Sequence, residues 1–98
     1  MNSEKKSKRT KTDADEAPEE ITDVKFMQLA DRFIDMANRQ NRSVKATALH
    51  MIMLYAAARY SAHVAKNVLN VEEHEPFVKE MTKVYQEMLR NHLADPNL

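Results

Sequence analysis

Apolar residues recur with a helical period along the first part of the chain that could fold. Between residues 23 and 41 they are three or four positions apart, which draws one stripe along a helix. Thr22 or Asp23 can accept the unpaired amides of a first turn, and Asn41 suits a left-handed helix end. We therefore predict a first helix over residues 23–41, with its apolar stripe formed by Phe26, Met27, Ala30, Phe33, Ile34 and Ala37.

The next segment is apolar on nearly every face. A helix over residues 44–69, capped by Ser43, is predicted, and such a helix is normally buried on most sides. At about 1.5 Å per residue it would span roughly 39 Å, against roughly 28 Å for either neighbour. Two shorter helices could not cover it completely. One of its stripes comprises Met51, Ile52, Tyr55, Ala58, Ala62 and Ala65.

A third helix is predicted over residues 76–94. Pro76 suits the first helical position, because its missing N–H costs nothing there. A start at Asn70, with Glu73 completing a capping box, is an alternative that would place Pro76 inside the helix and kink it. Short connections favour antiparallel neighbours, so we predict an all-α fold, a three-helix antiparallel bundle with a long central helix, in one domain over residues 21–98.

Residues 1–20 differ from the rest of the chain. A block of lysine and arginine between residues 5 and 11 is followed by an acidic block between residues 13 and 20. Nothing between them can enter a core, so a disordered, solubilising tail is predicted. The alternative is a basic arm that binds nucleic acid.

Composition excludes several functional classes. The chain has no glycine and no cysteine, which argues against phosphate-binding loops, thiolate catalysis, disulfides and cysteine-ligated metals. The fifteen basic and fifteen acidic residues balance. The N-terminal lysines precede no apolar stretch, and the longest uncharged run, residues 46–58, is too short to cross a bilayer. We expect a soluble cytoplasmic protein without a membrane segment.

Histidines and carboxylates show no spacing that suits a metal or a catalytic group. His50 and His63 are thirteen residues apart, and no histidine pair is four apart. In addition, no nucleophile has an oriented base. From these observations we predict no catalytic residue, metal or cofactor, and no enzymatic activity. His50 interrupts the most apolar stretch, so we expect it to be buried and hydrogen-bonded, with a ligand-binding or pH-sensing role as the alternative.

Arg59 is the one arginine within the apolar helix. A buried guanidinium requires a carboxylate, and Asp31 and Asp35 of the first helix are the candidates, with Glu80 as another. A structural ion pair is preferred over the capture of a ligand.

The all-round apolarity of the central helix predicts self-association, most simply as a homodimer. A non-enzymatic protein-interaction module is the leading functional hypothesis, and a nucleic-acid-binding or regulatory accessory protein with a basic arm is the alternative. Residues 21–98 carry ten basic and nine acidic groups, so the folded part adds little attraction for phosphate. The interface is predicted to comprise Leu49, His50, Met53, Ala57, Tyr60 and Val64.

Three short motifs carry a resemblance to a known family. Residues 30–40 read A-D-R-F-I-D-M-A-N-R-Q, residues 54–60 read L-Y-A-A-A-R-Y, and residues 85–89 read Y-Q-E-M-L. The chain resembles, over residues 24–94, a domain-of-unknown-function family of short bacterial helical proteins. It departs from that family's pattern at Met36, where leucine is usual, and lacks a glycine after the first helix. The resemblance implies a compact helical bacterial protein and assigns no functional residue.

Overall fold

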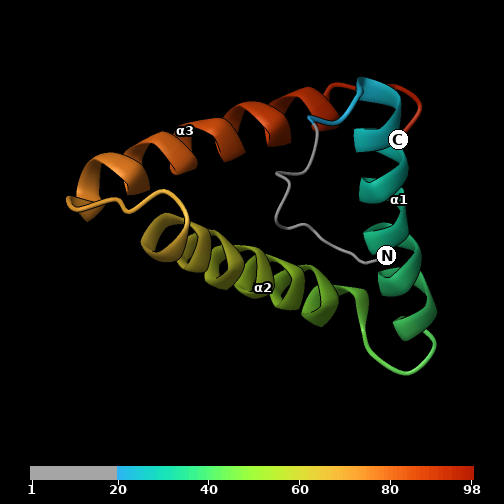
Figure 1. Cartoon of the computed structure of the whole chain (residues 1–98). Coiled ribbons are helices and arrows are strands. Elements are labelled where there is room, and N and C mark those ends of the chain that lie inside the picture. Colours follow the sequence, from blue (N-terminus) through green and yellow to red (C-terminus); the bar gives the residue numbers. More distant parts are fainter. Residues whose placement is uncertain (1–19) are drawn as a thin grey trace, which may run out of the picture. The chain divides into compact units, whose positions relative to one another are not determined.

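The computed structural model describes residues 20–98, and the predicted tail therefore lies, apart from Glu20, outside the described residues. The described residues form three α-helices and no strand, which confirms the all-α prediction (Figure 1). The chain divides into two units after Lys45. The first contains α1 (Asp23–Gln40), and the second contains α2 (Ala46–Asn67) and α3 (His74–Leu93). The antiparallel bundle stays a prediction.

The two ends of α1 differ in how well the sequence predicted them. Thr22 caps the N-terminus, since its hydroxyl accepts a hydrogen bond from the Lys25 amide at 3.1 Å. Asn41 was expected to be left-handed, and that prediction is wrong, because its φ is −64°. The chain keeps winding instead: the amides of Ser43 and Val44 both donate to the Gln40 carbonyl, at 3.0 and 2.9 Å. Ser43 thus belongs to this turn rather than to the cap of α2.

α2 is shorter than the sequence predicted. It begins at Ala46 and ends at Asn67, a length of 22 residues, whereas α3 has 20. At about 1.5 Å per residue these lengths are roughly 33 Å and 30 Å. The large excess in length predicted for the central helix is therefore absent. What distinguishes α2 is its composition and not its length.

A left-handed asparagine forms the corner between α2 and α3. Asn70 has φ 54°, the one positive φ in the part of the chain that the structure describes. The chain reverses there, so that the Val71 amide donates to the Ala65 carbonyl at 2.9 Å. Asparagine tolerates this conformation better than other residues with a side chain. An asparagine thus ends a helix in the left-handed conformation here, at Asn70 and not at the predicted Asn41.

α3 begins at His74, two residues before the predicted start. Pro76 is consequently the third residue of the helix and not the first. The amides of the first turn have no partner inside the helix, so proline breaks no hydrogen bond at this position either. Glu73 occupies the N-cap without a side-chain cap hydrogen bond.

Burial among the described residues is slight. Ala65 is the one buried residue among those described, at 6% exposure. Four of the half-buried residues lie near it in sequence, Ser61, Val64, Val71 and Phe77, and the others are spread over the chain: Leu29, Ala30, Ala37, Val44, Leu49 and Val84. The large apolar side chains elsewhere on the three helices are mostly exposed. The apolar stripes therefore lack the cover that normally stabilises helices of this length.

The corner gives a first prediction. Asn70→Ala should lower the free energy of unfolding by about 1 kcal/mol, because a Cβ without a compensating polar group is disfavoured at positive φ. Asn70→Gly should leave it unchanged or raise it slightly. Urea unfolding followed by circular dichroism measures both. Asn38→Ala, inside α1, is the control, and an equal loss of stability in Asn70→Gly and Asn70→Ala would contradict the prediction.

Candidate self-association surface

α2 carries two apolar faces. Successive residues turn by about 100° around a helix, so positions can be assigned to faces directly. The six residues predicted as an interface fall within an arc of about 100°; we call this set, Leu49, His50, Met53, Ala57, Tyr60 and Val64, the Leu49 face. A second set falls on the other side of the helix; we call this set, Met51, Leu54, Tyr55, Ala58, Ala62 and Ala65, the Met51 face.

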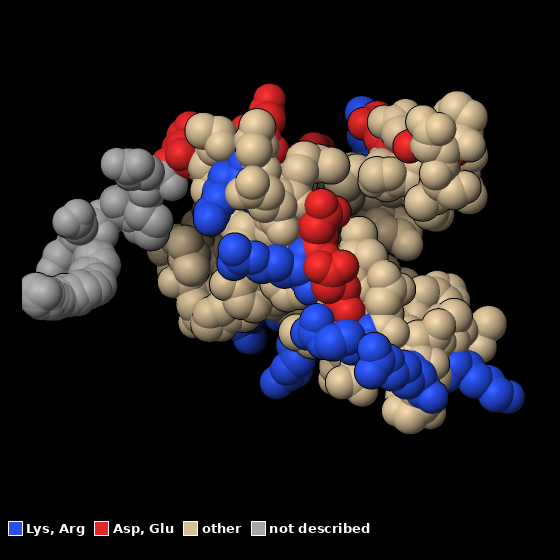
Figure 2. All heavy atoms as spheres, turned by 90° about the vertical axis from the view of Figure 1, so that its right-hand side faces the viewer, with Lys and Arg blue, Asp and Glu red and all other residues tan. Residues whose placement is uncertain are grey.

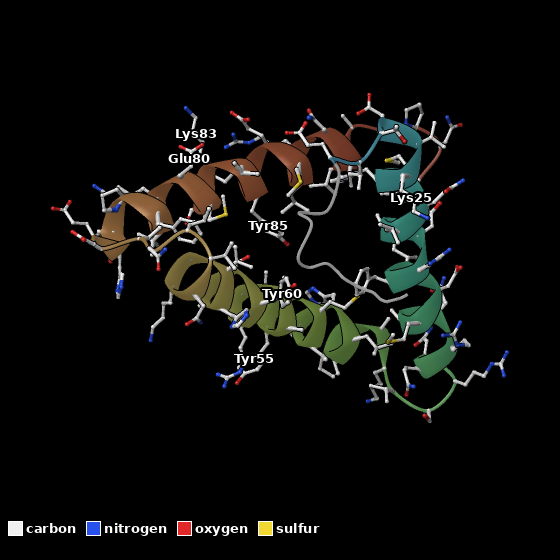
Figure 3. The ribbon with its side chains drawn as sticks, viewed as in Figure 1. Lys25, Tyr55, Tyr60, Glu80, Lys83 and Tyr85 are labelled. Carbon is white, nitrogen blue, oxygen red and sulfur yellow. The ribbon has the colours of Figure 1, made fainter. Side chains whose placement is uncertain are left out.

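The two tyrosines mark the two faces. Tyr55 and Tyr60 leave α2 on different sides (Figure 3). Both are largely exposed, at 69% and 70%. Among the described residues, each face of α2 therefore carries a tyrosine that is largely uncovered.

Side chains of the Leu49 face differ in exposure. Tyr60 is mostly exposed and Met53 is 39% exposed, while Leu49 and Val64 are half-buried. His50 is exposed, so the prediction that it is buried is wrong for the single chain. Its place beside apolar residues follows from its position on the border of the face. Whether this face is an interface stays a prediction.

A small polar group lies at the C-terminal end of the Leu49 face. The Asn67 side-chain amide donates to the His63 carbonyl at 3.1 Å and lies 3.1 Å from Nδ1 of the same histidine. The ring of Tyr60 lies 6.0 Å from that of His63, centroid to centroid. These contacts hold the ring of His63 against its own helix. The polar end thus adjoins the corner, and the apolar part of the face lies toward the N-terminus of α2.

α1 and α3 are each amphipathic, with one apolar stripe. In α1 the stripe includes Phe33 and Ile34, which are 65% and 50% exposed. In α3 it contains Met81, Tyr85 and Met88, exposed by 38% to 47%. An amphipathic helix packs its stripe against another apolar surface. The two faces of α2 are surfaces of that kind.

Two of the three candidate partners of Arg59, Asp31 and Asp35, do not share a unit with it, and the third, Glu80, does. Asp31 and Asp35 lie on α1 in the first unit, and Arg59 lies on α2 in the second. All three side chains are exposed. The ion pair stays a prediction.

Charge on α1 is sorted by side. Lys25, Arg32 and Arg39 are seven residues apart and follow one border of the apolar stripe, and Asp31 and Asp35 lie toward the other border. Basic and acidic side chains accordingly form separate groups on the surface shown in Figure 2. α1 therefore has a basic border and an acidic border.

Sequence reasoning missed a charge pattern on α2 and α3. Residues 36–71 contain five lysines or arginines and no aspartate or glutamate. Arg59 and Lys66 lie seven residues apart on α2, beside Tyr55 of the Met51 face, and Glu80 and Glu87 lie seven apart on one border of the α3 stripe. The seven-residue spacing was a signal available in the sequence.

Other chemistry finds no support in residues 20–98. No group of three histidine, cysteine, aspartate or glutamate side chains among them could hold a metal ion. None of the helices in that range is both long and apolar enough to span a bilayer. The basic arm of the nucleic-acid hypothesis lies outside the described residues, so that hypothesis stays a prediction.

Comparison with known proteins gives one match. A family described as a protein of unknown function (DUF3144) matches residues 26–96. The matched range begins inside α1 and ends beyond α3, and so takes in nearly all of the three helices. No curated protein and no solved structure matches the chain.

Proposed function

This chain belongs to DUF3144, a family of proteins of unknown function, and from that premise we propose that it is a non-enzymatic protein that self-associates as a homodimer. The family membership confirms the resemblance of the three motifs and assigns no activity. Support for the proposal therefore comes from the surface of the helices themselves. The Leu49 face of α2 is the proposed interface.

One observation carries the proposal. Ala65 is the single buried side chain among residues 20–98, while apolar side chains on every helix are more than a third exposed. Burying one large apolar side chain contributes about 1.5–3 kcal/mol, and most helical stability in proteins comes from such packing. Helices with so little burial need further apolar surface to persist in water. A second copy of the chain supplies it.

The distribution of apolar surface favours a dimer over a single folded chain. α1 and α3 each have one apolar stripe, whereas α2 has two faces and an apolar middle. A helix that is apolar all round is typical of the centre of a larger assembly. A two-fold symmetric dimer contains two α2 helices, which can lie at its centre, and four amphipathic helices, α1 and α3 of each copy. Such dimers are the commonest oligomers.

Composition supports the non-enzymatic part of the proposal. Without glycine or cysteine, the chain lacks the backbone and thiol devices of most phosphate-binding and covalent sites. Exposed apolar side chains, in contrast, occur along all three helices. Extended apolar surface of this kind marks association sites.

The mass in solution tests the proposal. Light scattering coupled to size-exclusion chromatography should give twice the chain mass of 11.4 kDa at micromolar concentration and above. Sedimentation velocity over a dilution series should then show the mass falling toward that of one chain. A single-chain mass at every concentration, together with full helix content, would contradict the proposal.

A further inference from the structure

The Met51 face of α2 has one charged border, and it is basic. Arg59 and Lys66 point about 70–90° from the centre of this face, on the same side of it. Each of them follows a residue of the face, Tyr55 or Ala62, by four positions. The opposite border, around Ser61, holds no lysine, arginine or carboxylate. A helix that packs on the Met51 face therefore meets positive charge along one side only.

The apolar stripe of α3 also has one charged border, and it is acidic. The stripe comprises Phe77, Met81, Val84, Tyr85 and Met88. Glu80 and Glu87 each directly precede a methionine of the stripe and point about 80–110° from its centre. Figure 3 shows Glu80 leaving α3 on the side away from Tyr85, and the border on the side of Tyr85 holds no lysine, arginine or carboxylate. Lys83 and Arg90 lie farther round the helix, on its polar side.

The basic and acidic borders meet when the two helices run parallel. In a parallel helix pair, residues that follow a core residue by four positions face residues of the partner that directly precede a core residue, and charges at these positions set partner and orientation. Arg59 then faces Glu80. Lys66, one repeat later, faces Glu87. An antiparallel pair would instead place each charged border against an uncharged one, so charge favours the parallel arrangement.

The register that pairs these charges also suits the shapes of the two helices. In it Met88 lies level with Ala62, whose small side chain leaves room for it. Residues 74–93 of α3 lie alongside residues 48–67 of α2. The two helices therefore overlap over nearly their whole length.

The α3 of the same chain cannot make this contact, because the connection is too short. His74 would have to lie level with Ala48, which is 19 residues, or roughly 28 Å, back along α2 from Asn67. The seven steps from Asn67 to His74 reach about 25 Å at most when fully extended, and they must also cross the roughly 8–10 Å between helix axes. In the structure the connection is far from extended, since the Val71 amide donates back to the Ala65 carbonyl at 2.9 Å. A parallel contact between α2 and α3 can therefore form only between copies.

Within residues 20–98 much of the Met51 face is open to a partner. Tyr55 is 69% exposed and Met51 53%, and Met88 of the α3 stripe is 47% exposed. Resting on the proposed homodimer, we propose that the Met51 face binds α3 of a second copy in parallel, with Arg59 and Lys66 facing the acidic border of that helix. By two-fold symmetry the contact occurs twice, so that α2 uses its Met51 face as well as its Leu49 face in the dimer. Apolar burial holds this contact together, and the charged borders set its orientation.

Cysteine cross-linking tests the orientation and the register, because the chain has no cysteine of its own. A variant with Ala62→Cys and Met88→Cys places two thiols level with each other in each proposed contact. Mild oxidation should convert most of it to a covalent dimer of twice the chain mass on a non-reducing gel. The matched control combines Ala62→Cys with Met81→Cys, whose thiols would lie seven residues, or roughly 10 Å, apart along the proposed contact and should not bond.

Charge reversal tests the two borders in the same cross-linking variant. Adding Arg59→Glu and Lys66→Glu should slow the formation of the covalent dimer at least about threefold, because like charges then face each other in both contacts. Adding Glu80→Lys and Glu87→Lys as well should restore the rate, since the charges are again complementary. An equal rate in all three variants would overturn the pairing of the borders.

The two cysteine pairs separate the proposal from its alternatives. A covalent dimer from the first pair and none from the control supports a parallel contact between copies. If the control instead loses both free thiols at the mass of one chain, α2 and α3 pack antiparallel within that chain and the proposal is wrong. No bond in either variant, or equal cross-linking in both, also overturns it, while light scattering of the unmodified chain can still show a dimer. A single-chain mass in that measurement would overturn the homodimer itself.

Discussion

Replacing Met53 by glutamate is expected to dissociate the homodimer. Met53 lies at the centre of the Leu49 face and is 39% exposed in the single chain. A carboxylate enclosed there would have no counter-charge, and an unpaired charge at a buried interface costs about 3 kcal/mol or more. The dissociation constant should therefore rise by more than about a hundredfold. Sedimentation velocity and circular dichroism measure the loss of mass and the accompanying loss of helix.

A matched apolar-to-glutamate change separates this effect from a general one. Val24 is 67% exposed and lies on the polar side of α1, between the directions of Asp31 and Asp35. Val24→Glu should leave the mass and the helix content unchanged. If Met53→Glu remained a dimer while Val24→Glu behaved as expected, the Leu49 face would not be the interface.

Thermal stability should depend on protein concentration. Because Ala65 is the one side chain buried among residues 20–98, most apolar burial would arise on association, and folding and association would be coupled. For a dimer of this size, each tenfold dilution should lower the melting temperature by roughly 4 °C. The measurement is a series of melting curves recorded by circular dichroism over at least two decades of concentration.

Whether the melting temperature depends on protein concentration distinguishes two kinds of protein. A chain that folds alone and associates afterwards by weak surface contacts has a melting temperature set by its own core. A constant melting temperature over the whole series would therefore contradict coupled folding. In that case the apolar stripes of α1 and α3 would have to cover the faces of α2 within one chain.

Helix identity could be read from the sequence because it depends on local patterns. The three-to-four spacing in α1 and α3 and the Thr22 cap predicted elements that the structure contains. Helix ends were harder, because they depend on which carbonyl the next amide reaches. Asn41 and Asn70 have the same side chain, yet only Asn70 adopts the left-handed conformation. After Asn41 the chain continues to wind, and the amides of Ser43 and Val44 donate to the Gln40 carbonyl instead.

The candidate surface was predictable in part, for a similar reason. Periodicity alone groups Leu49, Met53 and Tyr60 on one face, and the structure places them on one continuous helix. Periodicity does not say how exposed a residue is, and His50, which was expected to be buried, is exposed in the single chain. The seven-residue spacing of charges was missed because the basic pair and the acidic pair lie on different helices. The opposite signs of the two pairs are recognised only when α2 and α3 are compared, and reading each helix by itself does not make that comparison.

The all-round apolar middle of α2 also limits how this sequence can change. Around Ala56, Ala57 and Ala58 every direction from the helix axis leads to apolar surface or to its border. A larger or charged side chain there would disturb one face or the other, so these positions have little freedom to vary. Arg59 and Lys66 are exposed and lie outside this apolar middle, so they have more freedom to vary.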